Sequence, residues 1–287
     1  MRVILFLVFL TAAWPLVRAW LANRGTALIQ AIHWAGAAWL VWLLTILLGE
    51  TPGSQAGVEP GRYLALSLTG CAGVAVLGAR RPHVGAWNFV VLGLLAVQVL
   101  PLAEQILANK DSFGTLRFAF LGATVAVGIL NYLPTRLAAA ALLLTLGCAG
   151  EMVVLCAPEI GQARLTAIDI LAQACLVLTP WAAWASWRQR KTSHNLFDRL
   201  WLHFRNRFGL VWGQRVREQF NHSARNNGWQ VWLSWQGLRR IGLVTDPDLS
   251  TQRDFVETLN GLLKRFEEQE SRMEDGKIED RGSRMED

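Results

Sequence analysis

Four ionisable side chains inside or at the edges of long apolar segments are the residues best placed to carry chemistry. Glu151 and Asp169 lie within the last two such segments, Arg117 opens an earlier one, and Glu104 closes the segment before that. An ionisable group in the hydrocarbon core is costly to bury, so it often belongs to an ion pathway or pairs with another charge. Clustered in the outer half of a membrane, the four would suit a proton or cation pathway, or a polar pocket open to the outside.

A structural role explains the same four residues. Arg117 paired with Glu151 or Asp169 would join adjacent helices without any transport, and Arg117 and Glu104 could each extend to the membrane interface. The chain carries no recognised transporter motif, and its hydropathy has no inverted repeat. The structural and the transport interpretations therefore both stay open at this stage.

Other polar residues in the apolar segments favour packing over catalysis. His33 is the only histidine inside a segment, which excludes a bis-histidine haem site and predicts a hydrogen-bonded packing residue. Four in-segment amides are expected to tie helices together: Asn88, Gln98, Asn131 and Gln173.

Neither the cysteine spacing nor the motifs of soluble enzymes indicate a catalytic or metal site in the sequence. All four cysteines (Cys71, Cys148, Cys156 and Cys175) lie in apolar segments without a CxxC pair. Walker, GxSxG and HExxH motifs are absent. We therefore predict no catalytic residue, no metal site and no cofactor.

The elements that must position these residues are membrane-spanning helices. Hydrophobic residues make up 52% of the 287-residue chain and charged residues 17%, and the charges become dense only after Trp187. Seven stretches are apolar over about 20 residues, the length that crosses a hydrocarbon core: 3–22, 27–48, 62–79, 84–106, 114–133, 135–157 and 163–187. The predicted fold class is an all-α membrane protein, a bundle of about seven transmembrane helices over residues 1–187 with a small, mostly helical cytoplasmic C-terminal region.

The distribution of basic residues predicts the orientation. One set of links carries basic residues and no acidic ones before the tail: Arg18, Arg24, Arg80, Arg81 and Arg136, followed by Arg188, Arg190 and Lys191. By the positive-inside rule this side is cytoplasmic, so we expect the N-terminus outside and the C-terminus inside a bacterial-type cytoplasmic membrane. The first segment resembles a signal peptide, but its removal would reverse this assignment, so we expect it to be retained.

The tail, residues 192–270, has three predicted parts. A basic amphipathic helix over Leu196–His222 is expected to lie in the headgroup interface, with a possible bend at Gly209 and Gly213. A strand-like alternation follows over Trp229–Trp235, and a helix then starts near Ser250–Thr251, with an apolar stripe from Phe255 to Phe266. Residues 271–287 are a low-complexity, disordered tail.

These features favour a non-enzymatic scaffold or accessory subunit whose basic, Trp-rich tail contacts the inner leaflet and a partner. The predicted partners are the lipid bilayer, anionic lipid headgroups and another membrane protein, and nucleic acid is not expected. The predicted contact residues are basic or aromatic: Arg199, Trp201, Arg205, Trp212, Trp229 and Trp235. The alternative is a small-solute or proton/ion transporter that uses Glu151, Asp169 and Arg117.

Overall fold

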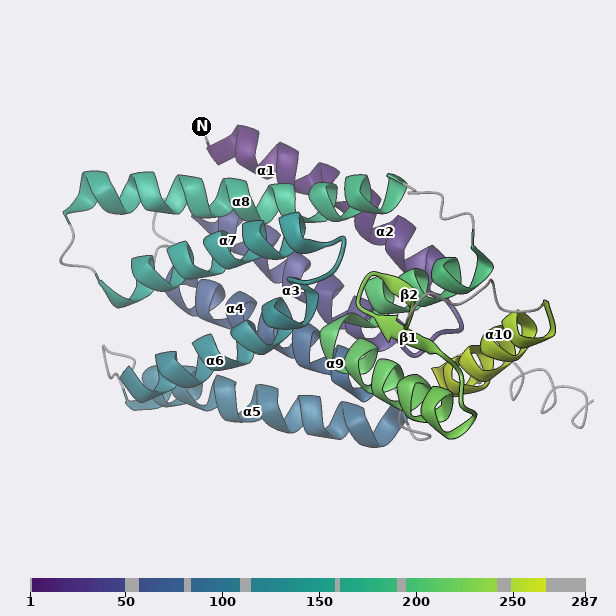
Figure 1. The fold of residues 1–287 in the computed structure, drawn as a ribbon. Coiled ribbons are helices and arrows are strands. Elements are labelled where there is room, and N and C mark those ends of the chain that lie inside the picture. Colours follow the sequence, from purple (N-terminus) through teal and green to yellow (C-terminus); the bar gives the residue numbers. More distant parts are fainter. Residues whose placement is uncertain are drawn as a thin grey trace, which may run out of the picture. The chain divides into compact units, whose positions relative to one another are not determined.

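The computed structural model of the chain describes residues 2–49, 57–79, 84–108, 115–157, 161–189, 195–241 and 249–266. The chain divides into two compact units (Figure 1). Unit 1 comprises Met1–Ala22 and Leu28–Gln189, and unit 2 comprises Asn23–Ala27 and Arg190–Asp287. The low-complexity segment 271–287 lies outside the described residues, as do Arg80, Arg81 and Lys191.

Helices account for nearly all the described secondary structure. Unit 1 contains α1 (Arg2–Thr11), α2 (Ala13–Ala22), α3 (Ile29–Leu48), α4 (Val58–Ala75) with the 3-10 turn η2 (Val76–Gly78), α5 (Val84–Ala108), α6 (Thr115–Tyr132), α7 (Ala138–Cys156) and α8 (Gln162–Arg188). Unit 2 contains α9 (Leu196–Asn226), β1 (Val231–Ser234), β2 (Gly237–Arg240), α10 (Leu249–Leu263) and the 3-10 turn η3 (Lys264–Phe266).

All seven apolar segments predicted from the sequence are helical. Among the described residues, five helices are long and apolar enough to cross a membrane: Ile29–Leu48, Val58–Gly78, Trp87–Glu104, Ala138–Cys156 and Gln162–Arg188. The other two apolar stretches, Phe6–Ala22 and Leu116–Tyr132, are shorter. The architecture is therefore compatible with a multi-pass membrane protein, with five spans supported by length and composition.

The first apolar segment is interrupted in the middle. Helices α1 and α2 meet at Ala12, where the amide of Leu16 reaches back to the Ala12 carbonyl at 3.5 Å. Pro15 lies just beyond, and its ring clashes with the carbonyl four residues earlier and lacks an N–H. Pro15 thus accounts for the break between the two short helices.

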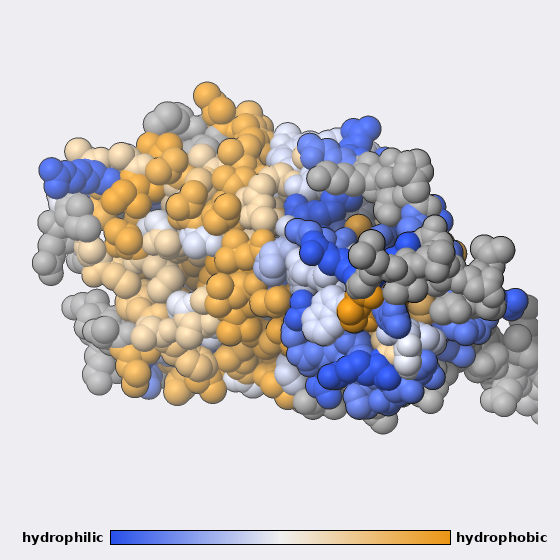
Figure 2. All heavy atoms as spheres, in the orientation of Figure 1, coloured by the Kyte–Doolittle hydropathy of each residue, from blue (hydrophilic) through white to orange (hydrophobic). Residues whose placement is uncertain are grey.

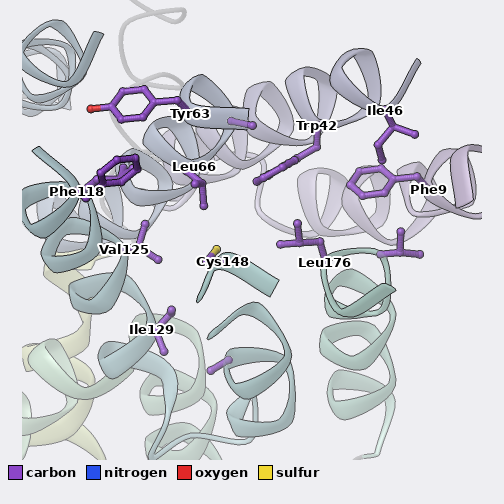
Figure 3. Packing of buried hydrophobic residues seen from close by; sticks show 14 of the residues in the cluster. Phe9, Trp42, Ile46, Tyr63, Leu66, Phe118, Val125, Ile129, Cys148 and Leu176 are labelled. Carbon is purple, nitrogen blue, oxygen red and sulfur yellow. The ribbon is translucent and has the colours of Figure 1, made fainter. Parts of the chain in front are cut away.

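Helix α4 lies at the centre of unit 1. It contacts α3, α5, α6 and α7, and 61% of its span is buried, against 22–39% for the other four spans. Its Tyr63 and Leu66 belong to a core that also contains Trp42 of α3, Cys148 of α7 and Leu176 of α8 (Figure 3). Because α4 carries this core on several sides, a polar residue on α4 has to find its partner inside the bundle.

The outer surface of unit 1 is apolar. Large side chains with two fifths or more of their surface exposed include Leu40, Leu44, Phe89, Leu130 and Leu171. In Figure 2 hydrophobic residues dominate the visible face of these helices, whereas hydrophilic residues dominate the visible face of unit 2. A contiguous apolar surface of this extent is typical of contact with lipid acyl chains.

Helix α9 of unit 2 is two helices joined at a kink. Gly209 has φ 80° and ψ −161°, values that no helical residue adopts and that only glycine reaches without strain. The helix begins at a side-chain cap, where Asn195 Oδ1 accepts a hydrogen bond from the Phe197 amide at 3.0 Å. The bend expected near Gly209 and Gly213 is therefore present at Gly209.

The strand-like segment after α9 is an antiparallel hairpin. Val231 pairs with Arg240 and Leu233 with Leu238. Val231 and Leu233 are buried, and Trp232 between them is 46% exposed, as expected from the two-residue period of a strand. Asn221 of α9 holds the hairpin, accepting from the Leu233 amide at 2.7 Å and donating to the Leu233 carbonyl at 3.1 Å.

Helix α10 packs along α9. Its apolar stripe is buried at Phe255, Leu259 and Leu263, and Phe266 of η3 follows them. The Phe266 ring contacts those of Phe204, Phe208 and Trp212 at centroid distances of 4.8–5.5 Å. Aromatic residues of α9 and α10 thus form the core of unit 2.

Candidate functional site

Three charged side chains meet inside unit 1. Arg62 of α4 donates from Nη1 to Glu151 Oε2 of α7 at 2.6 Å and to Asp169 Oδ1 of α8 at 2.5 Å. The three residues are 7%, 0% and 4% exposed, respectively. Arg62, Glu151 and Asp169 are called the ion centre below.

The ion centre has more negative than positive groups. One guanidinium faces two carboxyl groups, and Asp169 Oδ1 also accepts a hydrogen bond from Gln173 Nε2 at 2.8 Å. The second oxygen of Glu151, Oε1, is buried and has no hydrogen-bond partner among the described residues. A buried anionic oxygen without a partner is costly, so Glu151 Oε1 is a position where a proton or a small cation would be stabilised.

Glycines next to two of the three residues allow α3 to approach α4 and α7 to approach α8 closely. A Cβ on Gly61, which precedes Arg62, would lie 2.6 Å from Thr45 Oγ1 of α3. A Cβ on Gly150, which precedes Glu151, would lie 2.8 Å from the Cβ of Ala172 on α8. Both distances are shorter than a side chain tolerates, so glycine at these positions permits the α3–α4 and α7–α8 approaches that bring the charges together.

The ion centre lies near one end of the bundle. Arg62 is in the second turn of α4 and Asp169 in the second or third turn of α8, while Glu151 is in the second turn from the end of α7. At about 1.5 Å per residue, these positions are roughly 6–10 Å from the helix ends. The first turn of α4 contains Glu59-Pro60, and proline is tolerated there because the first-turn amides need no intrahelical acceptor.

A cleft of about 340 Å³ opens above the ion centre between the ends of α3, α4, α7 and α8. Its polar lining consists of Thr45, Glu59, Arg62, Gln162, Thr166, Asp169 and Gln173. Its apolar lining includes Trp42 and Ile46, which belong to the core in Figure 3. Glu59 is exposed at the start of α4, so a third carboxylate adds to the negative charge of the cleft.

The structure separates the four ionisable residues singled out in the sequence into two groups. Glu151 and Asp169 lie together in the ion centre, but Arg117 pairs with Glu104 instead. That pair is 38% and 41% exposed, as expected for side chains that extend toward an interface. The predicted partnership of Arg117 with Glu151 or Asp169 is therefore wrong, because Arg62 occupies the position between those carboxyl groups.

Arg62 is the member of the ion centre that sequence reasoning missed. The predicted apolar stretch 62–79 begins at this residue, which places it at the very end of the segment, whereas α4 begins four residues earlier at Val58. The signal was available in the sequence. The predicted topology already placed the start of this helix at the same membrane face as Glu151 and Asp169.

The other in-segment polar residues behave in different ways. His33 Nε2 accepts a hydrogen bond from the Trp20 indole at 3.1 Å. Asn88 of α5 donates to Gln30 Oε1 of α3 at 3.0 Å, which joins two helices as predicted. Gln173 instead bonds within its own helix, to Asp169. Gln98 is buried, and neither its amide nitrogen nor its oxygen has a hydrogen-bond partner among the described residues.

Cysteine positions add no reactive centre to the site. Cys71, Cys148 and Cys175 are buried free thiols, and Cys156 is an exposed free thiol. Within the described ranges, no group of three or more His, Cys, Asp or Glu residues is arranged to hold a metal ion.

Several tail residues predicted to contact lipid or a partner lie inside unit 2. Trp201 and Arg205 both donate to the Trp235 carbonyl, at 3.3 Å and 2.6 Å. Trp212 packs on Phe266, and Trp229 packs edge-on against Phe255 at 4.8 Å.

Burial decides which of these tail residues can reach another molecule. Trp201 is 0% exposed, and both Arg205 and Trp212 are 8% exposed. Trp229 and Trp235 are half-buried, whereas Arg199 is exposed. The apolar stripe from Phe255 to Phe266 packs against α9, so its buried side chains do not form a free surface.

Comparison with known proteins identifies no relative: no family model, no curated protein and no solved structure matches the chain.

Proposed function

We propose that this chain is a multi-pass protein of a bacterial-type cytoplasmic membrane that carries protons or a small monovalent cation through the ion centre. The observation that carries the proposal is the buried excess of carboxyl groups over arginine, with the partnerless Glu151 Oε1 beside it. One carboxylate already compensates the charge of Arg62, so the second acidic group leaves the ion centre able to take up a proton or a cation.

The proposed topology has seven spans, with the N-terminus outside and the C-terminus in the cytoplasm. The positive-inside distribution supports it, together with the helical state of all seven apolar segments. In this orientation the cleft opens to the outer side, because it lies at the ends of α3 and α7 and at the starts of α4 and α8. A solute would enter from outside and meet Glu59 first, then Asp169 with Arg62.

Arg62 has a clear part in this scheme. Its guanidinium is permanently charged and touches both carboxyl groups through one nitrogen, Nη1. When Glu151 or Asp169 takes up a proton or cation, Arg62 can remain bound to the other carboxylate. The arginine thereby couples the occupancy of Glu151 to the charge on Asp169.

The test measures ion flux in proteoliposomes. A pH-sensitive dye inside the vesicles reports proton flux driven by an imposed pH gradient, and sodium- or potassium-sensitive dyes report cation flux. Glu151→Gln and Asp169→Asn should each abolish the flux while the protein still purifies as a folded species. Glu104→Gln is the matched control, because Glu104 belongs to the half-exposed pair with Arg117. Wild-type flux in both ion-centre variants, or no flux in the wild-type protein, would overturn the proposal.

A second candidate function is a non-enzymatic accessory subunit. It is favoured by an open groove of about 730 Å³ on unit 2, which is lined by six polar and two apolar residues: Val211, Gln214, Arg215, Glu218, Gln219, His222, Ser223 and Leu262. A helix of another membrane protein would fit this surface better than a small molecule would. Deleting residues 192–287 should then release stoichiometric partners during purification in mild detergent, and unchanged co-purification would exclude this role for the tail.

A further inference from the structure

The outer face of the β1–β2 hairpin combines exposed apolar and basic side chains. Trp232 is 46% exposed and Ile241 is 57% exposed. Arg239 is directly opposite Trp232 in the register. The amide of Ile241 bonds to the Gln230 carbonyl at 3.1 Å, which extends the pairing by one residue. Because alternate residues share a face, Trp232, Arg239 and Ile241 lie on one side of the hairpin.

The inner face fixes this platform to unit 2. Val231 and Leu233 are buried, and Asn221 of α9 holds Leu233 through two hydrogen bonds. Arg239 Nη2 donates to Gln236 Oε1 at 2.9 Å, which orients its guanidinium along the outer face. The exposed Trp232 therefore projects from a hairpin whose backbone is held in place by α9.

The charge around the hairpin is strongly positive. Residues 195–241 contain eight arginines and two acidic residues. Such a surface attracts anionic headgroups, at about 1 kcal/mol for each Lys or Arg close to the membrane. Tryptophan favours the headgroup layer, and isoleucine favours the acyl chains just below it.

The hairpin belongs to a segment that is close in sequence to a candidate membrane span. The hairpin follows α9, and seven residues separate the end of α8 at Arg188 from the start of α9 at Leu196. Helix α8 is long and apolar enough to span a membrane. A link of seven residues reaches roughly 25 Å at most.

We infer that the outer face of the hairpin, formed by Trp232, Arg239 and Ile241, is a binding site for anionic lipid headgroups. Trp232 and Ile241 enter the headgroup layer and Arg239 contacts lipid phosphate or carboxylate groups. This assigns lipid contact to the hairpin, and not to the apolar side of α9, whose aromatic residues are occupied by the core of unit 2. It is independent of the transport proposal, because it involves none of the residues of the ion centre.

The experiment places an environment-sensitive fluorophore on Trp232→Cys in a Cys156→Ser background. Cys156 is the exposed native thiol, while Cys71, Cys148 and Cys175 are buried. The full-length protein is studied in nanodiscs of phosphatidylcholine alone and of phosphatidylcholine mixed with phosphatidylglycerol. The expected result is a blue-shifted emission and protection from iodide quenching only in the anionic discs, with both effects weakened by salt.

Two further variants separate a local lipid contact from general charge. Adding Arg239→Gln should lower the ratio of docked to free hairpin about fivefold, since it removes one basic group near the surface. Arg253→Gln removes the same charge from α10, where Arg253 already pairs with Glu257, and should leave the ratio unchanged. A probe at Asn227→Cys, on the exposed C-cap of α9, should stay accessible to iodide throughout.

Three outcomes would overturn the inference. The probe at position 232 could remain accessible to iodide in both disc compositions. It could be protected equally in neutral and anionic discs, which would indicate burial against protein. Protection could also survive Arg239→Gln and high salt unchanged, which would mean that anionic lipid is not the ligand.

Discussion

Each unit buries an arginine, and the two arginines are satisfied in different ways. Arg62 in unit 1 is 7% exposed and contacts two carboxyl groups. Arg205 in unit 2 is 8% exposed. It donates to the Trp235 carbonyl and to Asn206 Oδ1, and its guanidinium lies 5.3 Å from the Trp235 ring centroid. Neutral dipoles and an aromatic face hold the second arginine, whereas carboxyl groups hold the first.

The difference indicates what each arginine does. Arg205 ties the hairpin turn to α9 through its hydrogen bonds to the Trp235 carbonyl and to Asn206 Oδ1. Arg62 lies in a segment able to span a membrane, where any uncompensated charge is costly. The transport proposal depends on the two carboxyl groups that face one arginine in unit 1, whereas Arg205 joins α9 to the hairpin in unit 2.

The largest effect is expected when Arg62 is removed. Arg62→Met leaves Glu151 and Asp169 buried together without a cation, which should reduce the free energy of unfolding by about 3–5 kcal/mol. A thermal assay that follows alkylation of Cys71, Cys148 and Cys175, in the Cys156→Ser background, measures this directly. Combining Arg62→Met with Glu151→Gln and Asp169→Asn should restore most of the loss. A triple variant no more stable than the single one would mean that Arg62 acts through packing.

Removing Arg205 should have a smaller and more local effect. Arg205→Met removes the Arg205 donor from the Asn206 side chain and one of the two donors to the Trp235 carbonyl, where Trp201 remains, at about 1–3 kcal/mol. Hydrogen exchange followed by mass spectrometry should show faster exchange in residues 231–240 and unchanged exchange in α7 and α8. If exchange in α7 and α8 rose as well, the contrast between the two arginines would fail.

The close approach of α7 and α8 can be tested with a single methyl group. Gly150→Ala places a Cβ 2.8 Å from that of Ala172, so the helices must separate at a cost of about 1–3 kcal/mol. Gly36→Ala is the matched control, because no atom lies within 4 Å of the added Cβ, and it should be neutral or stabilising by up to about 1 kcal/mol. Equal thermal shifts in the two variants would argue against a packing role for Gly150.

The smallest change in stability is expected for substitution of Glu151, and it distinguishes the roles of the two carboxyl groups in the ion centre. Glu151→Gln removes the excess acidic group and should alter stability by less than about 1 kcal/mol. Asp169→Asn should cost more, because Asp169 accepts from both Arg62 and Gln173. The same thermal alkylation assay compares the two, and a larger loss for Glu151→Gln would mean that Glu151 is the main counter-ion of Arg62.

Helix placement was largely predictable from the sequence, since the length and hydropathy of an apolar run follow from local composition. The helix observed over Ile29–Leu48 differs by two residues from the predicted 27–48, and Gln162–Arg188 by one residue at each end from 163–187. The bend at Gly209 and the hairpin after Trp229 were also predictable, because each depends on residues adjacent in the chain. The start of α4 was missed because Glu59, Gly61 and Arg62 lower its apparent hydropathy.

The sequence by itself determined which segments are apolar helices, where the charges change in density, and that Glu151 and Asp169 lie within such helices. Only the tertiary structure decided their partner. Arg62 is 89 residues from Glu151 and 107 residues from Asp169 along the chain. Their contact depends on how closely α3 approaches α4 at Gly61 and α7 approaches α8 at Gly150. The tertiary structure likewise decided that Trp201 and Phe266 are buried, although their aromatic character was evident from the sequence. Burial depends on which surface another helix covers, and local composition carries no record of that choice.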